Sequence, residues 1–226
     1  MNFTAIDFET ANGFRGSACA IGAVKIRDGQ IADTHYTLLQ PPRGFDRFDP
    51  RNVAIHGITP EDVATAPSFA DHFDTFRAFV GDDVMVAHNA NFDIGVIESG
   101  LEVSHRPIPH MEFACTLTMS RKTYRLASHA LPSAAAEAGY VLDQHHNALA
   151  DAKAAAAIVV DAAKRWGVTN FAALLDACGM QRRIVQPREA GTQLSRPTRH
   201  AMTMPGMFAG SAGQAGAGGP IADWPH

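Results

Sequence analysis

The first ten residues, Met1–Thr10 (MNFTAIDFET), contain the pattern from which the rest of the chain can be interpreted. Residues 2–6 are mostly apolar and β-prone, which predicts a strand buried in a sheet. Because successive side chains of a strand point to opposite faces, Asp7 and Glu9 lie on one face and Phe8 on the other. Two neighbouring carboxylates repel each other, and hard divalent cations with their preference for oxygen ligands relieve that repulsion. The segment therefore predicts a metal site or, as the alternative, two exposed acids on an edge strand.

The composition limits the classes of protein to which the chain can belong. Its 226 residues, 46% of them hydrophobic, suffice for one domain with a sizeable core. The net charge of −4 argues against a protein that coats nucleic acid by bulk positive charge. The three cysteines are widely spaced and form no CxxC pair, which predicts reduced thiols rather than a zinc or redox site. With no signal peptide and no apolar run of membrane-spanning length, we expect a cytoplasmic protein without membrane contact.

Apolar periodicity and turn signals predict a mixed α/β domain over residues 1–185. Strands at 17–27 and 30–39, joined by an Asp-Gly turn, are expected to form an antiparallel meander with the first strand. The other elements that the pattern predicts are a strand at 83–87, helices at 68–80, 89–99, 131–138, 147–166 and 170–177, a short helix beginning at Thr59, and a helix of unclear period at 113–122. From 186 to 226 Gly, Ala and Pro dominate, which predicts a disordered tail.

Two further acids stand where helices begin beside this predicted sheet. Asp93 lies in the first turns of the helix after the fourth strand, and Asp151 in the first turns of the long alanine-rich helix. Strands that end at one edge, with a helix packed across that edge, can bring both acids to Asp7 and Glu9. Four carboxylates can hold two Mg²⁺ ions for in-line attack on a phosphodiester, and Mn²⁺ is expected to substitute for Mg²⁺.

A histidine pair precedes the long helix, and His146 stands five residues before Asp151. A loop position leaves the imidazole of His146 free to reach over the metals, and its pKa near neutrality suits removal of a proton from the attacking water. A structural or capping histidine is the alternative. Because consecutive loop side chains diverge, we expect only one of the two histidines to face the site and the other to point outward or pack locally.

In this order the motifs resemble the DEDD exonuclease superfamily in its histidine-bearing branch, the group of bacterial proofreading subunits, RNase T and oligoribonuclease. The matching residues are Asp7, Glu9 and Thr10 for D-x-E-T, Asn89, Phe92 and Asp93 for N-x-x-F-D after His88, and His146, Ala148, Asp151 and Ala152 for H-x-A-x-x-D-A. The segments His56–Thr59 and Leu131–Ser133 are also typical of this group. The tyrosine-bearing branch would have Tyr where Asn147 stands.

The resemblance implies a ribonuclease-H-like mixed sheet, an antiparallel meander plus parallel strands, flanked by helices. It implies metal-dependent 3′-to-5′ hydrolysis at the 3′ ends of single-stranded or frayed DNA, releasing nucleoside 5′-monophosphates in replication proofreading or repair, with a polymerase or clamp as a candidate partner. It assigns substrate binding to Phe8, Thr10, His56, Asn89 and Phe92, metal binding to Asp7, Glu9, Asp93 and Asp151, and catalysis to these four acids and His146. Because it places the base five residues before the last acid, it implies that His146 faces the site and that His145 points outward or packs locally.

Several alternatives stay open at this point. An RNA-trimming exoribonuclease would use the same site, and a non-catalytic nucleic-acid-binding module could share the fold. The basic cluster at 121–125 is expected either to hold substrate phosphates or to form a solvated face. The oligomeric state is left undetermined.

Overall fold

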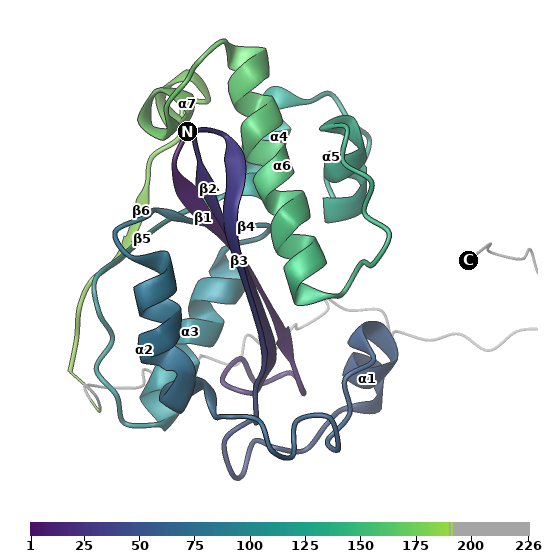
Figure 1. Cartoon of the computed structure of the whole chain (residues 1–226), viewed down its shortest axis with the longest axis vertical. Coiled ribbons are helices and arrows are strands. Elements are labelled where there is room, and N and C mark those ends of the chain that lie inside the picture. Colours follow the sequence, from purple (N-terminus) through teal and green to yellow (C-terminus); the bar gives the residue numbers. More distant parts are fainter. Residues whose placement is uncertain (190, 192–226) are drawn as a thin grey trace, which may run out of the picture. The chain divides into compact units, whose positions relative to one another are not determined.

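The computed structural model describes residues 1–189 and 191, so most of the predicted tail lies outside the described residues. One six-stranded sheet has the order β3-β2-β1-β4-β5-β6 (Figure 1). In chain order the elements are β1 (Phe3–Thr10), β2 (Ala18–Arg27), β3 (Gln30–Leu38), α1 (Pro50–His56), α2 (Phe69–Val80), β4 (Met85–Ala87), α3 (Asn91–Val103), β5 (Met111–Cys115), α4 (Thr116–Thr123), α5 (Leu131–Glu137), α6 (Ala148–Trp166), α7 (Phe171–Ala177) and β6 (Arg183–Val185).

The pairing of the strands confirms the predicted mixed sheet. β1, β2 and β3 form the antiparallel meander, whereas β4 runs parallel to β1 and β5 runs parallel to β4. The short strand β6 pairs antiparallel with β5 at the far edge. β1, β4 and β5 run in the same direction, so their C-terminal ends lie at the same end of the sheet. The loops that follow these strands therefore lie close together.

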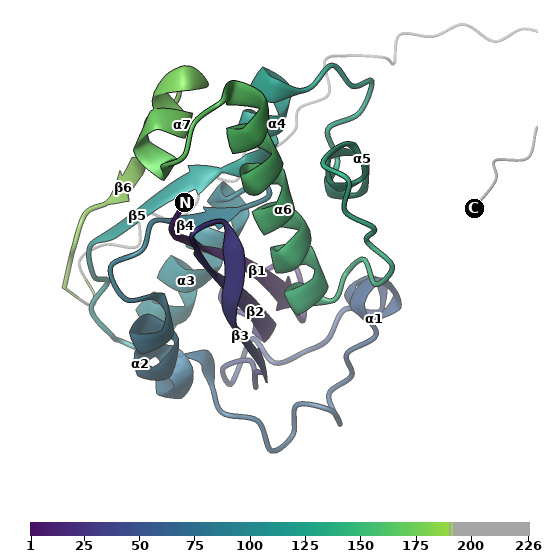
Figure 2. The same ribbon diagram turned by 45° about the horizontal axis from the view of Figure 1, so that its top comes forward.

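Helices cover both faces of the sheet, and the two views agree on their placement (Figure 1, Figure 2). α2 and α3 pack on one face against Ile6 and Phe8 of β1. α6 and α7 pack on the other face against Phe3 and Ala5. Since side chains alternate along a strand, the carboxylates of β1 share the α6 face with Phe3 and Ala5. The predicted separation of the acids from Phe8 is therefore confirmed.

Capping residues fix where the long helix α6 begins and ends. The side chain of Asn147 accepts a hydrogen bond from the Ala150 amide (3.1 Å), and Gly167 closes the helix in the left-handed conformation. This is the N-cap and C-cap pattern that the sequence predicts. It places Asp151 one turn into the helix, at the edge where β1 ends.

Two of the predicted helices are corrected. The short helix α1 begins at Pro50, capped by Asp49, whereas the segment after Thr59 forms only a turn in which Asp62 accepts hydrogen bonds from the Thr59 amide and hydroxyl. The segment at 113–122 divides into strand β5 and helix α4. In both places a short sequence is compatible with a helix and with another conformation, a turn or a strand. Contacts with neighbouring elements decide which of them forms.

The predicted domain boundary at residue 185 is also too early. The Arg188 backbone exchanges two hydrogen bonds with Ile108 (2.9 and 3.0 Å), and the Arg188 guanidinium pairs with Glu98 (2.8 Å) and Glu102 (2.5 Å). Composition averaged over 186–226 does not reveal these individual contacts. Residues 186–188 therefore belong to the folded domain, and residues 190 and 192–226 lie outside the described residues.

Gly22 of β2 allows α6 to approach the sheet. It lies opposite Asp7, and a Cβ at this position would overlap the backbone of Ala148 and Leu149 at the start of α6. Gly22→Ala is therefore expected to reduce the free energy of unfolding by about 1–3 kcal/mol, the usual cost of overpacking, and to displace Asp151. Urea unfolding measures the loss. Gly13→Ala is the matched control, because a Cβ at Gly13 meets no atom within 4 Å, and an equal loss in both variants would contradict the prediction.

Candidate active site

Four carboxylates from three elements converge at one edge of the sheet. β1 supplies Asp7 and Glu9, the first turn of α3 supplies Asp93, and the first turn of α6 supplies Asp151. One carboxylate oxygen from each of Asp7, Glu9 and Asp151 lies within 4.8 Å of the others. Asp93 is 1% exposed, and its Oδ1 accepts a hydrogen bond from the Phe8 amide (3.2 Å), which ties α3 to β1. The predicted convergence of these acids is thus present in the structure.

Burial raises the pKa of three of these carboxyls, and neighbouring acids add to the rise at Asp7 and Glu9. Burial, and then the charges of Asp93, Glu9 and Asp151, hold the pKa of Asp7 well above its usual range. Burial, followed by Asp151 and Asp93, raises the pKa of Glu9 to about 8. Burial also raises the pKa of Asp93 to about 8, although its hydrogen bonds with backbone amides and the Arg15 charge oppose the rise. Several acids that are costly to ionise together favour a site that binds cations.

The histidine pair before α6 is arranged differently from the prediction. Nδ1 of His145 lies 3.0 and 3.1 Å from the two carboxylate oxygens of Asp151, and the His146 amide donates to the same carboxylate (3.1 Å). The two imidazole rings stack with centroids 3.7 Å apart. His146 has a φ of 69°, and this left-handed backbone brings both side chains to one side. The expectation that only one of the pair can face the site is therefore wrong.

These groups line a pocket of about 300 Å³ at the end of β1. Its lining residues are Asp7, Phe8, Glu9, His88, Asn89, Phe92, Asp93, Leu131, His145, His146 and Asp151. Carboxylates form one part of the wall, and aromatic, aliphatic and amide side chains form another. The pocket can thus bind a cation beside the flat face of a base or sugar.

Comparison with known proteins identifies this arrangement. A family model described as Exonuclease, RNase_T, matches residues 4–159, a range that contains all four acids and both histidines. The chain belongs to the exonuclease family. The resemblance to the DEDD exonucleases, the ribonuclease-H-like fold and the prediction of a 3′-to-5′ exonuclease are thereby confirmed. Exonucleases of this superfamily use divalent metal ions.

A curated protein is similar to this chain in sequence. The DNA polymerase III of PolC type from Thermotoga petrophila is 32% identical over 174 residues, which cover 75% of this chain and 12% of the relative. The chain thus spans a small part of the length of that relative.

Solved structures share the fold. Exonuclease X in complex with 5′-overhanging duplex DNA is 26% identical, with a TM-score of 0.62, and the match covers 78% of this chain and 99% of that one. The nuclease domain of 3′hExo, a DEDDh family member bound to rAMP, is 16% identical, with a TM-score of 0.63, and the match covers 80% of this chain and 96% of that one.

Of the residues expected to bind substrate, Phe8, Asn89 and Phe92 line the pocket, whereas Thr10 and His56 lie beside it. His56 Nε2 and Asn52 Nδ2 lie 3.2 and 2.7 Å from the Thr10 carbonyl oxygen. The Ile58 amide donates to His56 Nδ1, so Nε2 is the protonated nitrogen that donates to Thr10. In this exonuclease His56 therefore anchors the end of β1 to α1.

His88 has a structural role that the sequence did not indicate. Its Nδ1 lies 3.0 Å from the Thr116 hydroxyl, and its Nε2 lies 2.9 Å from the His129 carbonyl oxygen. Both ring nitrogens are thus engaged away from the acids, and burial lowers the pKa of His88. The contact with His129 holds the segment before α5 against the pocket, where Leu131 forms part of the wall.

In the metal-free exonuclease we expect the free energy of unfolding to fall as pH rises from about 5 to about 8. The carboxyls of Glu9 and Asp93 titrate near 8 in the folded chain, whereas unfolded carboxyls titrate near about 4. Between these values the folded state holds more protons, so a rise in pH favours unfolding. Urea unfolding with EDTA measures the effect.

Divalent metal should reduce this pH dependence, because bound cations stabilise the ionised acids. Asp93→Asn should reduce it as well, since the amide does not titrate. A metal-free protein that becomes more stable between the same two pH values would contradict the prediction.

Proposed function

We propose that this exonuclease binds two Mg²⁺ ions in the carboxylate pocket and hydrolyses the last phosphodiester at 3′ ends of single-stranded or frayed DNA, releasing nucleoside 5′-monophosphates. The observation that carries the proposal is the convergence of four acids, Asp7, Glu9, Asp93 and Asp151, in one open pocket, although Glu9, Asp93 and Asp151 are buried. A purely structural module has no use for carboxylates that raise one another's pKa.

The donor set fits the proposed cofactor. Carboxylate oxygens are the ligands that Mg²⁺ and Mn²⁺ take, and three of the four acids present oxygens within 4.8 Å of one another. Asp7, Glu9, Asp93 and Asp151 would hold the ions. When bound, the ions supply charge stabilisation at the phosphate and favour the ionised form of the attacking water.

The residues of the chain provide positioning and proton transfer. His146 lines the pocket, and burial followed by the neighbouring His145 lowers its pKa, so its imidazole is neutral near physiological pH and can accept the proton of the attacking water. Phe92 and Leu131 offer apolar surface to the terminal nucleotide, and the Asn89 amide is a hydrogen-bonding group beside them. Thr10 and His56 would affect the terminal nucleotide indirectly, because the His56 contact with the Thr10 carbonyl oxygen positions the end of β1.

Two of the three similar proteins favour DNA as the substrate, whereas the 3′hExo structure holds rAMP. The PolC-type relative is a DNA polymerase, and the Exonuclease X structure holds duplex DNA with a 5′ overhang. Replication proofreading or repair, with a polymerase as partner, is therefore the setting that we propose. The free cysteines Cys19, Cys115 and Cys178 suit a reducing compartment such as the cytoplasm. Among the described residues, no helix is both long and apolar enough to cross a membrane.

The test is a side-by-side digestion of matched single-stranded DNA, RNA and mismatched primer ends by the full chain with Mg²⁺. We expect shortening from the 3′ end, release of nucleoside 5′-monophosphates, loss of activity with EDTA, and recovery with Mg²⁺ or Mn²⁺. Faster digestion of RNA would identify an exoribonuclease instead. Binding without digestion in any metal would identify a non-catalytic module and overturn the proposal.

A further inference from the structure

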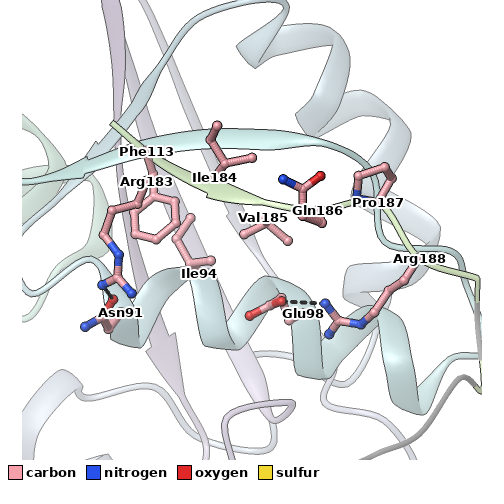
Figure 3. A pocket seen from close by; sticks show the side chains of 10 residues that line it. All are labelled: Asn91, Ile94, Glu98, Phe113, Arg183, Ile184, Val185, Gln186, Pro187 and Arg188. Atoms are coloured by element: carbon pink, nitrogen blue, oxygen red, sulfur yellow. Dashed lines mark hydrogen bonds and ion pairs between the residues drawn. The ribbon is translucent and has the colours of Figure 1, made fainter. Parts of the chain in front are cut away.

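A second hollow, of about 480 Å³, lies between α3 and the segment formed by β6 and residues 186–188 (Figure 3). Its floor is apolar and comes from Ile94 of α3, Phe113 of β5 and Val185 of β6. The wall formed by residues 183–188 lies beyond residues 4–159, the part of the chain that the exonuclease family model matches. We call this hollow the α3–β6 groove.

The groove adjoins the carboxylate pocket at the beginning of α3. Asn91 lines the groove, and the next residue, Phe92, lines the pocket. Two arginines meet at this junction: Arg183 donates a hydrogen bond to the Asn91 side chain, and Arg15 donates to the Asn91 carbonyl oxygen (3.0 Å). The Arg15 guanidinium lies over the Phe92 ring, 5.9 Å from its centroid.

Both guanidinium groups are held in place by packing. Arg183 lies over the ring of Phe113 at 5.3 Å. Arg15 crosses α3 at Gly95, where a Cβ would collide with the arginine side chain. Because the side chains are already ordered, little rotamer entropy remains to be lost when a ligand binds.

The charge along the groove is uneven. At the far end Arg188 is paired with Glu98 (Figure 3) and also with Glu102. At the end near the pocket, no ion pair joins Arg15 or Arg183 to a carboxylate within residues 1–188, and both arginines are exposed, although the Arg15 charge also acts on Asp93. The positive charge at this end of the groove thus lies beside the carboxylate pocket.

We propose that the α3–β6 groove binds the part of the substrate strand that lies 5′ of the nucleotide in the carboxylate pocket, with Arg183 and Arg15 contacting its phosphate backbone. This inference rests on the proposed function, because it extends the same substrate. A guanidinium presents several donors to phosphate oxygens in a fixed fork.

The test compares Arg183→Gln with Arg182→Gln in the full chain. Both changes remove one exposed arginine charge, but Arg182 pairs with Glu112 (2.6 Å) and lines a separate hollow beside Arg77. Fluorescence anisotropy of a labelled thymidine oligonucleotide, with Ca²⁺ in place of Mg²⁺, measures binding without hydrolysis. KM measured with Mg²⁺ on this oligonucleotide and on a thymidine dinucleotide gives the dependence on strand length.

For Arg183→Gln we expect the dissociation constant of the oligonucleotide to rise about threefold to tenfold, as for the loss of one exposed charged hydrogen bond. The slope of log affinity against log salt should become shallower by about 0.7, the value for one contact to a single-strand phosphate. Arg183→Lys should retain most of the slope, and the rise in KM should be larger for the oligonucleotide than for the dinucleotide. Arg182→Gln should show none of these changes.

Unchanged affinity and salt slope in Arg183→Gln, or equal changes in Arg182→Gln, would overturn the proposal and leave the proposed function intact. A fall in melting temperature confined to Arg183→Gln, without a change in slope, would show a purely structural role and also overturn it. A wild-type chain that hydrolyses no strand would overturn the proposed function, and the anisotropy measurements would still decide whether the groove binds nucleic acid.

Discussion

Replacing Asp7 by asparagine is expected to reduce hydrolysis of single-stranded DNA by at least about a thousandfold. Asp7 stands at the centre of the acidic cluster, within 4.8 Å of oxygens from both Glu9 and Asp151. Asparagine keeps the shape of the side chain but offers one neutral oxygen, which is a weak ligand for Mg²⁺. Metal ions supply several kcal/mol of transition-state stabilisation to phosphodiester cleavage, and about 4 kcal/mol corresponds to about a thousandfold in rate. Initial rates at saturating substrate measure the loss.

Thermal unfolding separates this loss of function from a loss of structure. In EDTA at pH 8 we expect Asp7→Asn to melt above the wild type, because burial and the neighbouring acids raise the pKa of Asp7 and make the carboxyl costly to accommodate at that pH. Added Mg²⁺ should stabilise the wild type more than the variant. Asp176→Asn, on the exposed side of α7, is the control for removal of one negative charge. Activity in Asp7→Asn equal to that control would contradict the metal-site assignment.

The elements that the sequence predicts correctly are those with strong local signals. β1 and β2 are buried, largely apolar strands, a two-residue turn joins β2 to β3, and α2, α6 and α7 begin at side-chain caps. Because each of these signals involves only a few neighbouring residues, it can be recognised in the sequence without knowledge of the tertiary structure. The positions of Asp7, Glu9 and Asp151 follow from β1 and α6, and that of Asp93 from α3, which the pattern also predicts, so the convergence of the acids could be expected together with the fold.

The elements that were missed depend on partners far along the chain. β5 and β6 are short, and they exist as strands because β5 pairs with β4 and β6 pairs with β5. α1 begins at a proline within a segment that otherwise reads as a loop. Such segments have weak propensities of their own, and tertiary contacts decide their conformation.

The same dependence on tertiary structure applies to the histidine pair and to the α3–β6 groove. A positive φ at His146 turns both imidazoles toward Asp151, and spacing along the sequence does not report such a turn. Arg183 lies 92 residues after Asn91, and only the β5–β6 pairing brings the two together. Motifs locate the residues that perform chemistry, whereas the surface that guides a strand to them is formed by long-range packing.

His146→Ala is expected to lower turnover about 10²–10⁴-fold, the usual range for loss of a general base. The wild-type rate should rise with pH as the imidazole loses its proton. Burial and the neighbouring His145 lower the pKa of His146, so this limb should lie below the ordinary value of about 6.5. In His146→Ala the limb should be absent. Affinity for Mg²⁺ should change little, because His146 supplies its backbone amide to Asp151 and alanine retains that hydrogen bond.

His145→Ala is the sharpest control, because the two rings stack and share one environment. Nδ1 of His145 lies 3.0 Å from an oxygen of Asp151, and His145→Ala removes this contact. The Asp151 carboxylate still accepts the hydrogen bond from the His146 amide (3.1 Å). We expect a much smaller loss of turnover in His145→Ala and a retained pH limb. Isothermal titration with Mn²⁺ then tests whether either variant has lost metal instead of a base. Equal losses of turnover in the two variants, or a loss of metal affinity in His146→Ala, would contradict the role of His146 as the base.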